Sequence, residues 1–134
     1  MPRRPKADPR RGARDARALP PGLQRAMCRR WPPSAYSRGQ TLYYQGHGSY
    51  GLFHICSGTI RLTRENGGAP AEAGPGTLLG VRELLTGVPH AHTATVGPDP
   101  ARVSFIDKTE FLDLIARQHS IAQAILQLLL SPAP

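Results

Sequence analysis

The stretch of sequence that decides the fold runs from residue 50 to residue 64 and reads YGLFHICSGTIRLTR. Apolar and polar side chains alternate in both of its halves, and in the second half Ile60 and Leu62 share one face. Alternation with a period of two is typical of β-strands. Because Ser57 and Gly58 form a turn signal between the halves, the pattern predicts a hairpin of two strands.

Short strands and turns continue on both sides of this stretch. The chain has 134 residues, of which 14 are glycine and 14 are proline, and breakers at this frequency favour short strands over long helices. About eight strands are expected between residues 36 and 107, including 41–44, 92–96 and 101–106, with a loop at 66–76. This pattern predicts a mainly β fold, a double-stranded β-helix or jelly-roll barrel without long exposed edges.

Helices are expected only at the two ends of this roll. Residues 19–31 place apolar side chains every four residues after two prolines, which indicates a short helix. Asp107, with Glu110 three residues later, predicts the capped start of another helix at about 108. A second C-terminal helix is expected from about Ser120 to Leu130. It carries an unusually apolar stripe, so we expect it to pack on the roll or to form a homodimer; the stripe is Ile121, Ala124, Ile125 and Leu128.

The first 18 residues form a segment of a different kind. They contain seven basic residues and two aspartates, and so hold five of the eight net positive charges of the chain. Without aromatic or β-branched residues, the segment cannot bury enough apolar surface to fold. We therefore divide the chain into a disordered basic arm at residues 1–18 and one domain at residues 19–134. One alternative function follows, that of a nucleic-acid-associated protein acting through the arm.

Several other classes of protein are excluded by what the sequence lacks. We find no apolar run of the roughly 18 residues that a membrane span requires, and no apolar segment of a secretory signal behind the basic N-terminus. Cys28 and Cys56 fit no metal-binding spacing, so we expect reduced thiols in a cytoplasmic protein. We also find no catalytic triad order, no plausible carboxylate pair and no phosphate-cradling loop before a lysine, so we expect no enzyme.

Several segments in a fixed order resemble the effector domain of the Crp/Fnr transcription regulators and of related cyclic-nucleotide-binding domains. The resemblance covers residues 19–130 and implies a regulatory jelly roll of the RmlC-like kind that senses a small molecule. The helix-turn-helix of the full-length regulators is absent, so we expect no DNA-binding domain here, and either a stand-alone module or a truncated regulator. The segments that carry the resemblance are residues 38–46, 52–62, 75–80, 84–89, 93–96 and 106–115.

The resemblance also implies one ligand site, a cassette in which helix amides behind a glycine face a cyclic phosphate. In that family a glutamate after the glycine holds the ribose and a later arginine pairs with the phosphate. Here the glycine is Gly80 and an assisting hydroxyl is Thr93, but Val81 stands at the glutamate position and either His90 or His92 at the arginine position. Each lost charge-assisted bond is worth about 1.5–3 kcal/mol, so we expect a degenerate cassette that binds cyclic nucleotides roughly two to four decades more weakly.

Neighbouring residues leave alternatives open. Arg82 together with His92 would make the chain a genuine binding domain for cyclic AMP or cyclic GMP. Glu83 would replace the missing glutamate if the register slid, although Gly80 would then no longer open the cassette. A protonated His90 or His92 would meet a phosphate near or below about pH 6.5, with affinity rising on acidification. The two histidines share one face of an extended segment, but we find no third ligand, so we expect no metal, no haem and no other cofactor.

Overall fold

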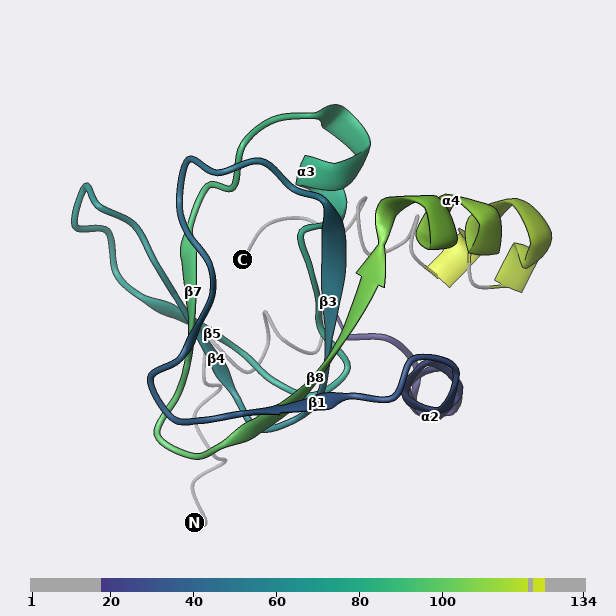
Figure 1. The fold of residues 1–134 in the computed structure, drawn as a ribbon, viewed down its shortest axis with the longest axis horizontal. Coiled ribbons are helices and arrows are strands. Elements are labelled where there is room, and N and C mark those ends of the chain that lie inside the picture. The colour runs from purple at the N-terminus through teal and green to yellow at the C-terminus, as the bar shows by residue number, and fades with distance from the viewer. Residues whose placement is uncertain (1–17, 121, 125–134) are drawn as a thin grey trace, which may run out of the picture.

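Two four-stranded antiparallel sheets face each other to form the roll in the computed structural model, which describes residues 18–120 and 122–124 (Figure 1). Their strand orders are β1-β8-β3-β6 and β2-β7-β4-β5. The predicted mainly β jelly roll is confirmed, but the sheets do not close into a barrel. The strands are β1 (Ser34–Tyr36), β2 (Thr41–Tyr43), β3 (Gly51–Ser57), β4 (Ile60–Thr63), β5 (Ala71–Ala73), β6 (Leu78–Leu79), β7 (Thr93–Val96) and β8 (Ala101–Asp107).

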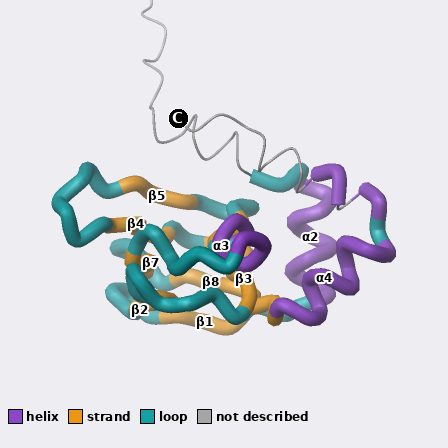
Figure 2. The backbone as a smooth tube through the Cα atoms, turned by 90° about the horizontal axis from the view of Figure 1, so that it is seen from above, coloured by secondary structure: helices purple, strands orange, loops and turns teal. Residues whose placement is uncertain are grey.

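The helices α2 (Pro21–Arg30), α3 (Val81–Thr86) and α4 (Lys108–Arg117) accompany the sheets, and residues 119–120 and 122–124 are also helical. Helices α2 and α4 lie side by side next to the β1-β8-β3-β6 sheet, and α3 lies at one end of the roll (Figures 1 and 2). The predicted cap of α4 is present, because the Asp107 carboxylate accepts from the Glu110 N–H at 2.8 Å. Glu110 in turn accepts from the Trp31 indole N–H at 2.8 Å, which ties the end of α2 to α4.

The stretch at residues 50–64 forms two strands, but the prediction that they pair as a hairpin is wrong. β3 pairs with β6 and β8, whereas β4 pairs with β5 and β7. Gly58, with a φ of 85°, turns the chain from one sheet to the other. A Cβ at this glycine would lie 2.8 Å from Ala101, so the crossing also needs the absent side chain. Local alternation identifies strands but says nothing of their partners.

Both faces of the β3 sheet are covered, which gives the molecule two cores. The side chains of β3 alternate between them, so Leu52 joins the core beneath the helices while Ile55 joins the core between the sheets. The helix-side core consists of Leu19, Met27, Trp31, Leu52, Val81, Leu84, Ile106 and Phe111. The inter-sheet core consists of Ile55, Ile60, Ala73, Leu79, Ala94, Val96, Ala101 and Val103. Val81 and Leu84 come from α3, so the helix-side core fixes this helix to the roll.

Several sequence predictions fall at or beyond the limits of the described residues. Residues 1–17 of the basic arm lie outside them, whereas Ala18 forms a bridge with Thr77 and so belongs to the fold. Most of the predicted apolar stripe also lies outside, at Ile121, Ile125 and Leu128, and the homodimer stays a prediction. Ala124 is described and packs against the helix-side core. Among the described residues, no helix combines the length and the apolar character needed to cross a membrane.

Candidate functional site

The candidate cassette is the turn that leads from β6 through α3 towards β7. Gly80 caps α3 with a φ of 94°, a left-handed conformation that favours glycine. A Cβ at this position would lie 3.4 Å from the Gly51 carbonyl oxygen and 3.4 Å from Cε1 of His90. Gly80 therefore makes the turn and also allows His90 to approach the backbone.

His90 fills the space beside this glycine. Its ring is buried and stacks on Tyr43, with 3.8 Å between the ring centroids and 18° between the ring planes. The His90 N–H donates to the His47 carbonyl, and the His90 carbonyl accepts from the Gly46 N–H, both at 2.9 Å. The Nδ1 atom of the ring is buried and has no hydrogen-bond partner. The imidazole is therefore held by stacking and by its backbone rather than by polar side chains.

Burial favours the neutral form of the His90 ring. Burial lowers the pKa of His90, Glu83 opposes this shift and His47 adds to it. The pKa of Tyr43 is raised, mainly by burial and also by Glu83. This side of the cassette thus presents a neutral imidazole and a neutral phenol near a carboxylate. A phosphate site needs the opposite, a cation that donates hydrogen bonds.

The three residues that follow Gly80 differ in their surroundings. Val81 is buried in the helix-side core, where it offers no hydrogen-bonding atom to a ribose. Arg82 is exposed on α3, and Glu83 is half-buried. Because Val81 packs inward, the position at which the resemblance implies a glutamate belongs to the core of this chain.

The remaining predicted residues lie on β7 and just before it. Nε2 of His92 accepts from the Arg64 Nε–H at 3.0 Å, beyond the end of β4. The Thr93 hydroxyl oxygen accepts from the Gln45 N–H at 2.9 Å, so it supports the turn after β2. The structure thus brings His90, but not His92, against Gly80.

The end of β2 contributes a residue to this site that the sequence did not indicate. Tyr43 lies in the strand predicted at residues 41–44, and it is the residue on which His90 stacks. The pairing of β2 with β7, in which Tyr43 lies opposite Ala94, brings the two segments together. Nothing in the local sequence signals this pairing, because about 50 residues separate the partners.

Outside the cassette, the structure corrects the prediction that the two cysteines are reduced thiols. Cys28 of α2 and Cys56 of β3 form a disulfide with a Cα–Cα distance of 6.3 Å. The bulge in the pairing of β3 with β8 lies at Cys56, where the strand can turn a side chain out towards α2. Together with His54 they form the one group of three possible metal ligands found among the described residues.

Facing antiparallel sheets, a glycine-capped short helix and flanking helices define a jelly roll. A family model described as the cyclic nucleotide-binding domain matches residues 33–118. The chain therefore belongs to the cyclic nucleotide-binding domain family, as the resemblance seen in the sequence implies. A comparison with curated proteins finds none that matches this chain.

Solved structures agree with this assignment. The chain is similar to the Catabolite Activator Protein of Thermus thermophilus, with 26% identity and a TM-score of 0.67 over 83% of this chain and 54% of that protein. It thus spans about half the length of that relative. The N-terminal domain of a transcriptional regulator from Streptomyces coelicolor A3(2) matches with 20% identity and a TM-score of 0.62, over 91% of this chain and 83% of that one. A structure from a cyclic-GMP-dependent signalling pathway of bacterial phytopathogenesis gives 22% identity and a TM-score of 0.72, over 82% and 90%.

Proposed function

We propose that this chain is a non-enzymatic regulatory domain that keeps the cyclic-nucleotide-binding fold but responds to an input other than a cyclic nucleotide. The observation that carries the proposal is the position of His90. Its buried, neutral ring lies against Gly80 and stacks on Tyr43, where the family resemblance implies a phosphate-pairing arginine. A ligand phosphate would have to displace this ring and would find no charge in its place.

Val81 supports the same conclusion from the ribose side of the cassette. Its side chain is 7% exposed and belongs to the helix-side core, so it does not replace the hydrogen bonds of a carboxylate. Losing the contacts of both the glutamate and the arginine costs about 3–6 kcal/mol of binding free energy, since each charge-assisted hydrogen bond is worth about 1.5–3 kcal/mol. Affinity for cyclic nucleotides falls by roughly two to four decades relative to a cassette that keeps both anchors.

A genuine cyclic-nucleotide-binding domain is the second candidate. It is favoured by the intact turn at Gly80 and by the exposed Arg82 beside it on α3. His92 adds to this candidate, because it accepts a hydrogen bond from Arg64, which places a cation beside the residue that precedes β7. In this alternative Arg82 and His92 together take over the phosphate.

Thermal unfolding of the full chain, with and without saturating cyclic AMP or cyclic GMP, separates the two candidates. A ligand at about 100 times its dissociation constant stabilises a domain by roughly 2.7 kcal/mol, which raises Tm by about 8 °C or more at this size. We expect no shift for the wild type. A shift that the Arg82→Gln variant abolishes would replace our proposal by the second candidate.

A His90→Arg variant tests the reason for the lost affinity. Restoring one charge-assisted bond should strengthen cyclic-nucleotide binding about 10–100-fold, measured by titration calorimetry on the full chain. His92→Arg is the matched control and should not change the affinity, because His92 does not face Gly80. Equal gains in the two variants would contradict the assignment of His90 to the arginine position.

A further inference from the structure

A second group of possible ligand side chains lies between α2 and the face of the β3 sheet that the helices cover, which we call the outer face, away from the cassette. The Cys28 Sγ, Cys56 Sγ and a ring nitrogen of His54 lie within 4.8 Å of one another. Nδ1 of His54 is 3.6 Å from the Cys28 sulfur and 3.7 Å from the Cys56 sulfur. Two sulfurs and one imidazole nitrogen are the donor set that soft and borderline metal ions prefer.

We propose that the reduced chain binds one Zn²⁺ ion through Cys28, His54 and Cys56. With Zn–S bonds of about 2.3 Å and a Zn–N bond of about 2.0–2.1 Å, tetrahedral geometry places sulfur about 3.6 Å from nitrogen and the two sulfurs about 3.8 Å apart. Both nitrogen–sulfur distances in the structure already agree with this geometry. Only the two sulfurs have to separate once the bond between them is broken.

The environment of His54 provides an independent reason for a ligand here. The residue is fully buried, its Nδ1 faces the two sulfurs and its Nε2 has no hydrogen-bond partner. An imidazole buried with so little polar compensation is unfavourable for folding. It is also preorganised as a metal ligand, because its position is fixed by the surrounding core before any ion arrives.

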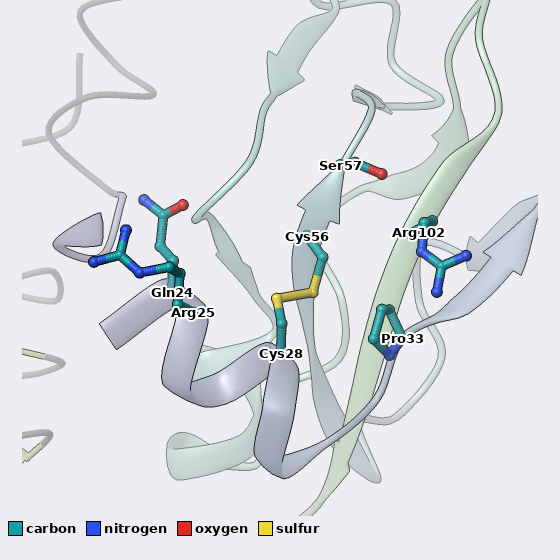
Figure 3. Close-up of a pocket in the computed structure, with 7 residues that line it drawn as sticks. All are labelled: Gln24, Arg25, Cys28, Pro33, Cys56, Ser57 and Arg102. Atoms are coloured by element: carbon teal, nitrogen blue, oxygen red, sulfur yellow. A yellow bond between two sulfur atoms is a disulfide. The ribbon is translucent and has the colours of Figure 1, made fainter. Parts of the chain in front are cut away.

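A cavity gives access to this group from outside. It has a volume of about 340 Å³ and reaches both sulfur-bearing residues (Figure 3). Its lining consists of Gln24, Arg25, Cys28, Pro33, Cys56, Ser57 and Arg102. A reductant and a hydrated ion can therefore approach the sulfurs, and the open side leaves a coordination position for water, as in three-ligand zinc sites.

The cross-link and the metal exclude each other. A dithiol reductant supplies two electrons and two protons, so that the Cys28–Cys56 bond breaks, two thiols form and the reductant closes its own disulfide. Zn²⁺ then displaces both thiol protons and is held by two thiolates and the neutral imidazole. In this scheme helix α2 and strand β3 are joined by the disulfide when the two cysteines are oxidised, and by a metal ion when they are reduced.

The test uses the full chain, reduced with a phosphine under argon, and Co²⁺ as the optical probe for the Zn²⁺ site. We expect one Co²⁺ per chain, a near-ultraviolet thiolate-to-cobalt charge-transfer band, and the intense visible bands of tetrahedral cobalt, all removed by one equivalent of Zn²⁺. Two protons should be released for each Zn²⁺ bound, measured with a pH indicator in weak buffer. The oxidised chain should bind no metal.

Variants assign the site to its residues. Cys28→Ser should abolish the charge-transfer bands of the full site, and His54→Asn should weaken Zn²⁺ binding by more than about 100-fold, beyond the loss typical of outer-shell partners. His119→Asn alters an exposed histidine of the same chain and is the matched control, with unchanged binding. Far-ultraviolet circular dichroism of each variant shows whether it is folded.

Three results would overturn the proposal. One is a folded, reduced wild type that takes up no Co²⁺ or Zn²⁺. Another is His54→Asn binding Zn²⁺ as tightly as the wild type, since the thiols would then act without the imidazole. The last is a chain that unfolds as soon as its disulfide is reduced, because no preorganised site would exist. None of these results bears on the cyclic-nucleotide cassette, which is tested separately.

Discussion

His54 and His90 are both buried histidines with a ring nitrogen that has no hydrogen-bond partner, yet they lie in different kinds of surroundings. His54 faces two sulfurs and lies on β3, which the disulfide joins to α2. His90 lies in a loop, stacked on Tyr43 and held by two backbone hydrogen bonds. The surroundings of His54 are fixed by a disulfide, whereas His90 fills a space that one substitution can open.

This difference separates the two regions on which our two proposals rest. At the cassette, the backbone turn is kept, while an imidazole and a core valine stand where the family resemblance implies an arginine and a glutamate. On the outer face, three donor atoms converge from α2 and β3 although the sequence separates Cys28 from Cys56 by 28 residues. Each region can be perturbed separately, and the expected effects differ in size.

The largest effect is expected from removing the cross-link beside His54. For a closed loop of 28 residues, the chain-entropy relation predicts a loss of about 3–4 kcal/mol of unfolding free energy. Urea denaturation of the wild type with and without a reductant measures this loss. The Cys28→Ser variant is the control, because its stability should no longer depend on the reductant. If the oxidised and the reduced wild type were equally stable, the packing of α2 on β3 would not depend on the disulfide.

A smaller effect is expected at His90. His90→Ala removes a buried ring and its stacking on Tyr43, and should cost about 2–3 kcal/mol, since deletion leaves a cavity and an aromatic pair contributes about 0.5–1.5 kcal/mol. His92→Ala is the matched control two residues away and should cost no more than about 1 kcal/mol, because its ring is partly exposed. Equal losses in denaturant unfolding would contradict the view that His90 alone closes the cassette.

The fold could be predicted from the sequence wherever local patterns decide it. The alternation at residues 101–106 and the cap at Asp107 are local, and both strand β8 and helix α4 are found where these signals place them. The partners of the strands are not local, and so Gly58 was interpreted as a hairpin turn although it joins two sheets. The hydrophobic pattern is satisfied equally by either pairing.

The sites were predictable to a smaller extent for the same reason. The family resemblance implied a cassette at Gly80 but left His90 and His92 as equal choices, because the decision depends on which ring packs against β2. The sequence placed Cys28 and Cys56 in separate elements without any sign that the elements touch. Contacts between residues distant in the chain come from tertiary packing, which a single sequence does not display.

The smallest effect concerns the pH dependence of stability at the cassette. Burial lowers the pKa of His90 in the folded chain, against the opposing influence of Glu83 and with that of His47. In the unfolded chain the group returns to its ordinary pKa of about 6.5, so between these two values the unfolded state binds a proton that the folded state does not. Stability is therefore complete above about pH 6.5 and declines as the pH falls towards the folded pKa, by at most about 1.4 kcal/mol per pH unit for this one group.

The His90→Phe variant keeps a ring for stacking on Tyr43 but cannot take up a proton, so its unfolding free energy should decline less steeply between about pH 7 and pH 5. All other titrating groups are common to the wild type and the variant, so their contributions cancel when the two slopes of unfolding free energy against pH are compared. Equal slopes would mean that the His90 ring is not shielded from protons and that the cassette is more open than the stacked ring implies.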